Sequence, residues 1–203
     1  MAVCLLNQDI LLSTACGYSL KQITDLYLAN YSDVTATTIG KPTGEETTGV
    51  EVLTITMKAD AKFYHIEPAK DSATYDDALQ VGDGGSKYRT STVTFNISGA
   101  YTPDMVDVID ALSLGRYIIV AKLSDGTYVM FGRLTPMEAN ATSLQSAAEA
   151  TGFNGITVTF TNNNTEAPLP LSAAAINTVL GQGASAWRAA TNVASKTRSK
   201  KTK

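Results

Sequence analysis

Between residues 102 and 134 the apolar and polar positions first follow a helical period and then alternate as in a β-hairpin. Thr102 is a good N-cap, and Pro103 follows at the first helical position, where its missing N–H costs nothing. Five apolar residues share one stripe of this helix and are expected to pack it onto the fold: Met105, Val106, Val108, Ile109 and Leu112. Three acidic residues line the opposite face: Asp104, Asp107 and Asp110. The pattern predicts an amphipathic helix at about residues 102–114.

A hairpin is predicted directly behind this helix. Gly115 stands where a helix usually ends, and the run R-Y-I-I-V-A-K-L that follows is rich in β-branched residues. The sequence S-D-G then supplies a turn before the second run, T-Y-V-M-F-G-R-L, so that residues 116–134 read as two paired strands.

Shorter alternating runs predict the remaining strands. They lie at 24–31, at 92–100, at 156–160, and in one long strand from residue 50 to 66 that is kinked near 59–61. The Thr- and Gly-rich residues 32–49 and the period-free residues 68–91 are predicted to be loops. Residues 135–152 are small and polar, with a helical turn at 144–149, and Ser172 is expected to cap a short helix.

About seven strands with short connections and one principal helix predict an α+β domain. We expect a predominantly antiparallel β-barrel or sandwich with the helix at 102–114 packed on one side. Residues 1–19 are predicted to form an N-terminal arm, and residues 20–168 the β domain with its long loop 68–91. Residues 169–203 are predicted to be an extension with a basic, disordered C-terminal tail.

Composition agrees with a soluble globular protein of one core. The chain has 203 residues, of which 44% are hydrophobic, and no apolar run approaches the roughly 20 residues that span a bilayer. The first residues lack the basic segment of a signal peptide. Cys4 and Cys16 have no metal-site spacing, so they predict neither a disulfide framework nor a zinc site, and reduced cysteines in a cytosol-made protein are the preferred interpretation.

Charge is distributed unevenly along the chain. Six basic residues follow Trp187 and no acidic residue does: Arg188, Lys196, Arg198, Lys200, Lys201 and Lys203. Residues 1–187 therefore carry 10 basic against 19 acidic residues, a net charge of −9. The basic tail can contact nucleic acid through phosphates, although a solvated terminus is the simpler interpretation.

Catalytic chemistry finds little support in the sequence. His65 is the only histidine and lies in a strand pattern without a G-x-S-x-G context, so a structural role is favoured. Two acidic groups have the oxygen ligands that a hard cation prefers, and each is more simply a solvated surface: Asp104, Asp107 and Asp110 on the helix, and Asp76, Asp77 and Asp83 in the loop. The run V-G-D-G-G-S-K lacks the full phosphate-loop pattern. We expect no enzyme activity, metal, cofactor or small-molecule substrate.

The order of motifs over residues 20–168 resembles structural proteins of tailed bacteriophages. The residues that carry the resemblance are I-T-D-L-Y-L-A-N-Y-S-D-V at the start, F-N-I-S-G-A-Y before the helix, D-A-L-S-L-G-R-Y-I-I-V behind it, the hairpin, and the late T-G-F-N-G-I-T-V-T-F. The chain is similar to tail-tube or tail-ring proteins of phages that infect Bacteroidota, including crAss-like phages.

This resemblance implies a virion subunit that is made in the host cytoplasm and assembles with copies of itself into rings, commonly hexameric, around a channel that passes DNA. Neighbouring tail or connector proteins are its other expected partners, and no membrane is involved. Segment 68–91 would be the arm that reaches an adjacent subunit or ring. Its expected anchors are the large apolar residues Tyr75, Leu79, Val81 and Tyr88.

Two alternatives remain open from the sequence. The extension beyond residue 168 departs from a minimal tube subunit, which leaves a head–tail connector or ring protein as an interpretation. A capsid-decorating or adhesive module, in which segment 68–91 binds a lattice or glycan, is the other.

Overall fold

The computed structural model describes residues 22–42, 49–98, 103–146 and 153–181. Its elements are β1 (Ile23–Asn30), the 3₁₀ turn η1 (Tyr31–Asp33), β2 (Val34–Gly40), β3 (Glu51–Met57), β4 (Tyr64–Ile66), β5 (Thr74–Val81), β6 (Lys87–Ser98), α1 (Pro103–Leu114), β7 (Arg116–Leu123), β8 (Tyr128–Phe131), β9 (Met137–Gln145), β10 (Gly155–Asn164), β11 (Leu169–Pro170) and α2 (Ala173–Leu180).

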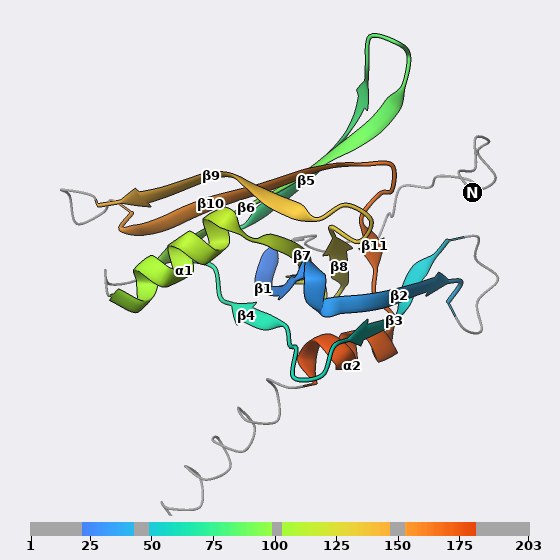
Figure 1. Cartoon of the computed structure of the whole chain (residues 1–203), viewed down its shortest axis with the longest axis horizontal. Helices are drawn as coiled ribbons and strands as arrows, with labels where there is room; N and C mark the ends of the chain where they lie inside the picture. Colours follow the sequence, from blue (N-terminus) through green and yellow to red (C-terminus); the bar gives the residue numbers. More distant parts are fainter. Residues whose placement is uncertain (1–21, 43–48, 99–102, 147–152, 182–203) are drawn as a thin grey trace, which may run out of the picture.

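Antiparallel pairing connects most of these strands. The main sheet runs β11-β8-β7-β9-β10-β6-β5, and β1 pairs with both β7 and β4. Strands β2 and β3 form a separate two-stranded sheet. In Figure 1 the long β9–β10–β6 ribbon lies across the β1–β7–β8 layer, with α1 beside the ribbon and α2 under β3. Within the described residues the sheet does not close into a barrel, so the chain has the layered, sandwich form of an α+β fold.

Strand β7 lies at the centre of these layers. It pairs with β1 along its length, while β9 pairs with its first residues and β8 with Ile119–Lys122 on the other side. Residues Tyr117 to Ala121 are all buried, so the strand has no solvent face. A continuous apolar run such as Y-I-I-V-A is what a strand covered on both faces requires.

Two apolar clusters form on opposite faces of β7. Tyr117, Ile119 and Ala121 point into the larger cluster, which includes Phe95 and Phe160 from the ribbon. Ile118 and Val120 point into the second cluster, which α2 and the β2–β3 sheet cover. Because side chains alternate along a strand, the single run 117–121 supplies both cores.

Helix α1 closes the end of the larger cluster. Met105 and Ile109 pack against it, and Leu112 is buried within it. The phenol of Tyr117 donates a 2.6 Å hydrogen bond to the carbonyl of Ala111, which also accepts a 2.9 Å hydrogen bond from the Gly115 amide. Gly115 is required there, because a Cβ at this position would overlap the Tyr117 ring.

The predicted packing stripe of α1 needs one correction. Val108 is 44% exposed, and Val106 is half-buried but is not among the residues packed against the larger cluster. The helix meets the sheet along the narrow line of residues 105, 109 and 112, and Val108 lies about 60° to one side of that line at 100° per residue. Thr102 lies outside the described residues, so its predicted capping role has no structural outcome.

The prediction of a loop over residues 68–91 is wrong. Most of this segment is a β-hairpin, in which β5 pairs with the first half of β6 from Thr74↔Thr94 to Val81↔Lys87. The backbone groups of this hairpin find their partners in each other. Backbone pairing therefore stabilises the hairpin without a regular alternation of apolar and polar side chains. Because that alternation is missing, the sequence pattern predicts a loop here.

Three other local predictions are also wrong. Residues 34–40 form strand β2 where a loop was expected, and residues 137–145 form strand β9 where a polar segment with a helical turn was expected. The single strand at 50–66 is two strands, β3 and β4, separated by turns with Asp60 at φ 64°. The hairpin at β7–β8, with its turn at residues 124–126, and the Ser172 cap of α2 are confirmed.

The ring contacts of Phe160 give a test of the larger core. Phe160 is fully buried, with ring centroids 6.0 Å from Phe95 and 5.6 Å from Tyr117. Phe160→Ala should lower the free energy of unfolding by about 3–5 kcal/mol, because it removes apolar contacts and leaves a cavity. Urea denaturation measures this change. Leu144→Ala, at an exposed position of the adjacent strand β9, is the matched control and should cost less than about 0.5 kcal/mol.

Candidate assembly surface

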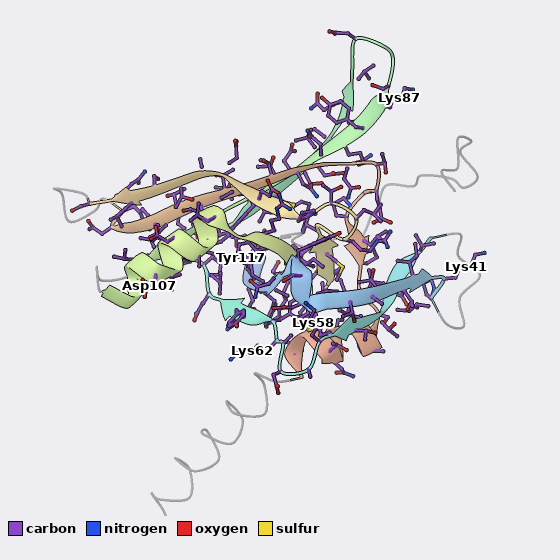
Figure 2. All side chains as sticks on the ribbon, in the orientation of Figure 1. Lys41, Lys58, Lys62, Lys87, Asp107 and Tyr117 are labelled. Carbon is purple, nitrogen blue, oxygen red and sulfur yellow. The ribbon has the colours of Figure 1, made fainter. Side chains whose placement is uncertain are left out.

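The most prominent projection of the molecule is the hairpin formed by β5 and the first half of β6. We call residues 74–91 the arm. It extends away from the layered body at one end of the ribbon, with Lys87 near its tip (Figures 1 and 2). Its turn, residues 82–86, is closed by hydrogen bonds from the Gly82 amide to the Ser86 carbonyl and from the Gly85 amide to the Gly82 carbonyl.

One face of the arm carries three large apolar side chains and continues the core face of the sheet. Tyr75 lies opposite the buried Val93, and its ring centroid is 5.3 Å from that of Phe131. Leu79 and Val81 follow at alternating positions on the same face and are 57% and 62% exposed. The inward face of the sheet thus runs beyond the part of the body that covers it.

An ion pair stiffens the middle of this face. Asp77 accepts a 2.7 Å hydrogen bond from Arg89 Nε and a second, shorter one from Arg89 Nη2. Its other carboxylate oxygen accepts a 2.7 Å hydrogen bond from the hydroxyl of Ser91. The Asp77 side chain is only 10% exposed, so a fully partnered carboxylate separates Tyr75 from the exposed Leu79 and Val81.

The four predicted arm anchors are therefore not equivalent. Tyr75, Leu79 and Val81 share one face, where Tyr75 contacts the body and the other two face solvent. Tyr88 lies opposite Gln80 on the other face and is half-buried.

A second ion pair lies near the base of the arm. Arg133 donates to both carboxylate oxygens of Glu166, at 2.7 and 2.6 Å, and both side chains are mostly buried. A hollow beside this pair is lined in part by Ser91 and Asn164 and holds about 10 Å³, space for about one water molecule. The pair thus ties the β8–β9 connection to the β10–β11 connection.

The single histidine belongs to a polar cluster on β1. His65 Nε2 lies 2.9 Å from Asp25 Oδ1, and Lys122 Nζ donates to Asp25 Oδ2 at 2.9 Å. The ring of Tyr27 stacks on that of His65, with 4.9 Å between centroids. Strand pairing assembles the cluster, since Asp25 lies opposite Lys122 and Tyr27 opposite His65. His65 thus lies in a strand, β4, as the sequence pattern predicted, and its ring contacts Asp25 and Tyr27.

The environment shifts three pKa values in this cluster. Burial would raise the pKa of Asp25, but hydrogen bonds from Lys122, His65 and Thr24 outweigh it and hold that pKa below its ordinary value. The hydrogen bond to Asp25 raises the pKa of Lys122. Burial, followed by the charge of Asp25 and the proximity of Tyr128, raises the pKa of Tyr27 to about 12. All three shifts favour the protonation states present at neutral pH.

The acidic groups considered as cation ligands do not come together. Asp77 is engaged by Arg89, Asp76 and Asp83 are exposed on the arm, and Asp107 and Asp110 are exposed on α1. The side chain of Asp104 lies outside the described residues. Within the described part of the chain, no cluster of three or more His, Cys, Asp or Glu residues is arranged to hold a metal ion.

The structure leaves the C-terminal basic residues undescribed. Arg188, Lys196, Arg198, Lys200, Lys201 and Lys203 all lie beyond residue 181, as Cys4 and Cys16 lie before residue 22. Among the described residues, neither helix has the length and apolar character needed to cross a membrane.

Comparisons of the chain with protein-family models, with curated proteins and with solved structures found no match.

The sequence pointed to three of these features and missed the ion pairs, including Arg133–Glu166. It singled out the arm's apolar residues and His65, and it placed acidic residues on α1. It missed the Asp77–Arg89 pair and the Asp25–Lys122 pair, whose partners come together only through strand register. The lone Lys122 inside the apolar run of β7 was the one available signal for the second pair.

The Asp77–Arg89 pair gives a test of arm stiffness. Asp77→Ala should lower stability by about 1–3 kcal/mol, because it leaves the half-buried guanidinium and the Ser91 hydroxyl without their acceptor. It should also speed amide exchange in residues 78–81 and 87–90 more than in β7. Asp76→Ala, on the opposite and exposed face of β5, should change neither quantity measurably. Equal exchange in the two variants would contradict a stiffening role.

The raised pKa of Tyr27 gives a test at alkaline pH. Its phenol is kept neutral in the folded state, so its contribution to stability is complete below pH 10 and is lost as pH rises through about 12. Tyr27→Phe should therefore lose less free energy of unfolding between pH 10 and 12 than the wild type does. The difference in free energy of unfolding between the two proteins should stay constant between pH 7 and 9. Urea melts at each pH measure this free energy for both proteins. Parallel stability curves throughout would contradict this assignment.

Proposed function

We propose that this protein is a structural subunit of a tailed-bacteriophage virion that assembles into rings or a tube of the tail. The rings are hexameric and surround a channel through which DNA passes. The function lies in contacts between copies and with neighbouring tail or connector proteins, and the protein is not an enzyme.

The arm is the observation that carries this proposal. A monomer gains nothing from an apolar strip that projects past its own body, because Leu79 and Val81 remain in water. Packing the strip against another copy would bury both side chains, each of which is worth about 1.5–3 kcal/mol when fully removed from water. The Asp77–Arg89 pair supports the same interpretation, because it holds the arm in shape before any contact forms.

The open edges of the sheet give further support. Strand β5 has a ladder partner on one side only among the described strands, as does the short β4. Unpaired strand edges are usually covered in the assembled state, and ring subunits cover them with neighbours. The net charge of −9 over residues 1–187 is compatible with a channel wall along which DNA moves without adhering.

Assembly of the wild-type protein tests the proposal. We expect concentration-dependent rings or tubes by negative-stain electron microscopy, with matching large species in sedimentation velocity. Rings without tubes would favour the connector-ring alternative, and discrete trimers without a channel would favour the capsid-decorating module. A protein that stays monomeric at high concentration in near-physiological salt would contradict the proposal.

A pair of variants ties that assembly to the arm. Leu79→Asp with Val81→Asp should prevent assembly and leave the monomer folded, because both positions are exposed in the single chain. Gln80→Asp adds a charge to the opposite face of the same strand and should assemble normally. Circular dichroism melts should show all three chains folded. Normal assembly of the double variant would exclude the arm from the interface.

A further inference from the structure

The outer face of helix α1 carries an apolar patch that no described element covers. Val108 is 44% exposed and Leu114 is 86% exposed, and the exposed Ala111 lies between them along the helix. Asp107 and Asp110 flank this patch and are themselves exposed. Neither carboxylate has an ion-pair partner among the described residues, so the outer face is apolar in its middle and negative at its rim.

The arm presents the complementary combination. Leu79 and Val81 form its apolar strip, and Lys87 lies directly opposite Val81 in the register of the two strands. Lys87 is exposed and has no ion-pair partner within the described ranges, whereas Arg89 is already engaged by Asp77. On the face that carries Leu79 and Val81, Lys87 is therefore the charge left without a partner among the described residues, while the exposed Asp83 lies in the turn beyond it.

These two surfaces lie at opposite ends of one strand. Strand β6 begins at Lys87 in the arm and ends at Ser98, shortly before α1 begins at Pro103. Twelve residues at about 3.3 Å each separate its ends by roughly 35 Å, and Figure 1 shows the arm rising from one side of the ribbon while α1 lies along the other. The arm of one chain thus cannot reach its own α1.

We propose that the outer face of α1 is the docking site for the arm of a second copy of this chain. Leu79 and Val81 of one copy pack on Val108 and Leu114 of the next, and Lys87 lies near Asp107 and Asp110. Two different surfaces meet in this contact, so it is heterologous and generates a closed ring or an open filament, according to the rotation between copies. The inference rests on the proposed self-assembly and names the acceptor surface within it.

Another exposed apolar pair fits the arm less well. Ile39 lies in β2 and Val50 directly precedes β3, and their neighbours Lys41 and Glu51 carry opposite charges. The rim there offers no net attraction for Lys87, in contrast to the two carboxylates on α1. Charge complementarity thus selects α1.

Disulfide trapping between two different single-cysteine variants tests the docking directly. In a background with Cys4→Ser and Cys16→Ser, one variant carries Val81→Cys on the arm and the other carries Val108→Cys on α1. Mixed and mildly oxidised during assembly, they should give a covalent dimer that contains one chain of each kind, identified by mass. A chain with both changes should give a ladder of covalent multimers.

Controls separate this inference from the proposed function. Ile39→Cys mixed with Val81→Cys should give little cross-linked product, and Val81→Cys alone should give few arm-to-arm dimers. The docking site would be overturned if the wild type assembles but the Val81→Cys and Val108→Cys variants do not cross-link. It would also be overturned if cross-links between positions 81 and 39, or between two copies of position 81, dominate. Self-assembly would stand in either case. A wild type that never assembles would overturn both.

Charge reversal gives an independent measurement. Lys87→Glu should raise the concentration needed for half-maximal assembly about two- to fivefold, the range expected for loss of an exposed ion pair. Combining it with Asp107→Lys and Asp110→Lys in the same chain should restore assembly, because every arm then meets a reversed acceptor. A purely structural effect of Lys87→Glu would not be rescued, and that result would contradict the docking site.

Discussion

The burial of β7 on both of its faces is the constraint on which the rest of the fold depends. Each of its buried side chains belongs to one of two cores, so β7, together with its neighbours β1 and β8, joins the ribbon and α1 to the β2–β3 sheet and α2. A change of register by one residue would exchange the two sets of side chains between cores of different shape. The run at residues 117–121 therefore defines the alignment of both layers at once.

Local signals predicted the elements around β7 correctly because those signals are complete within the segment. The helix at 103–114, the β7–β8 hairpin and the Ser172 cap each depend on residues close in sequence. The arm and β9 escaped prediction for the opposite reason. Runs such as T-Y-D-D-A-L-Q-V have polar residues on both faces, so only pairing with β6 identifies them as strands.

The polar contacts depend even more on strand register than on residues close in sequence. Asp25 and Lys122 are 97 residues apart, and Asp25 and His65 are 40 apart, so their meeting is a product of register alone. Asp77 and Arg89 lie on two strands of one hairpin, and finding the pair required knowing that the hairpin exists. The apolar anchors of the arm could be named from their size, but the face on which each lies could not.

The edge of the arm has a consequence for how the chain avoids the wrong association. Strand β5 offers an open row of backbone donors and acceptors, to which any extended chain could add a further strand. Asp76 projects from that strand on one face, and the carboxylate of Asp77 is held on the other. A strand that joined this edge would place its own side chains beside both charges. The arm thus discourages indiscriminate strand addition along its edge, and only a strand whose side chains suit these two carboxylates would cover it.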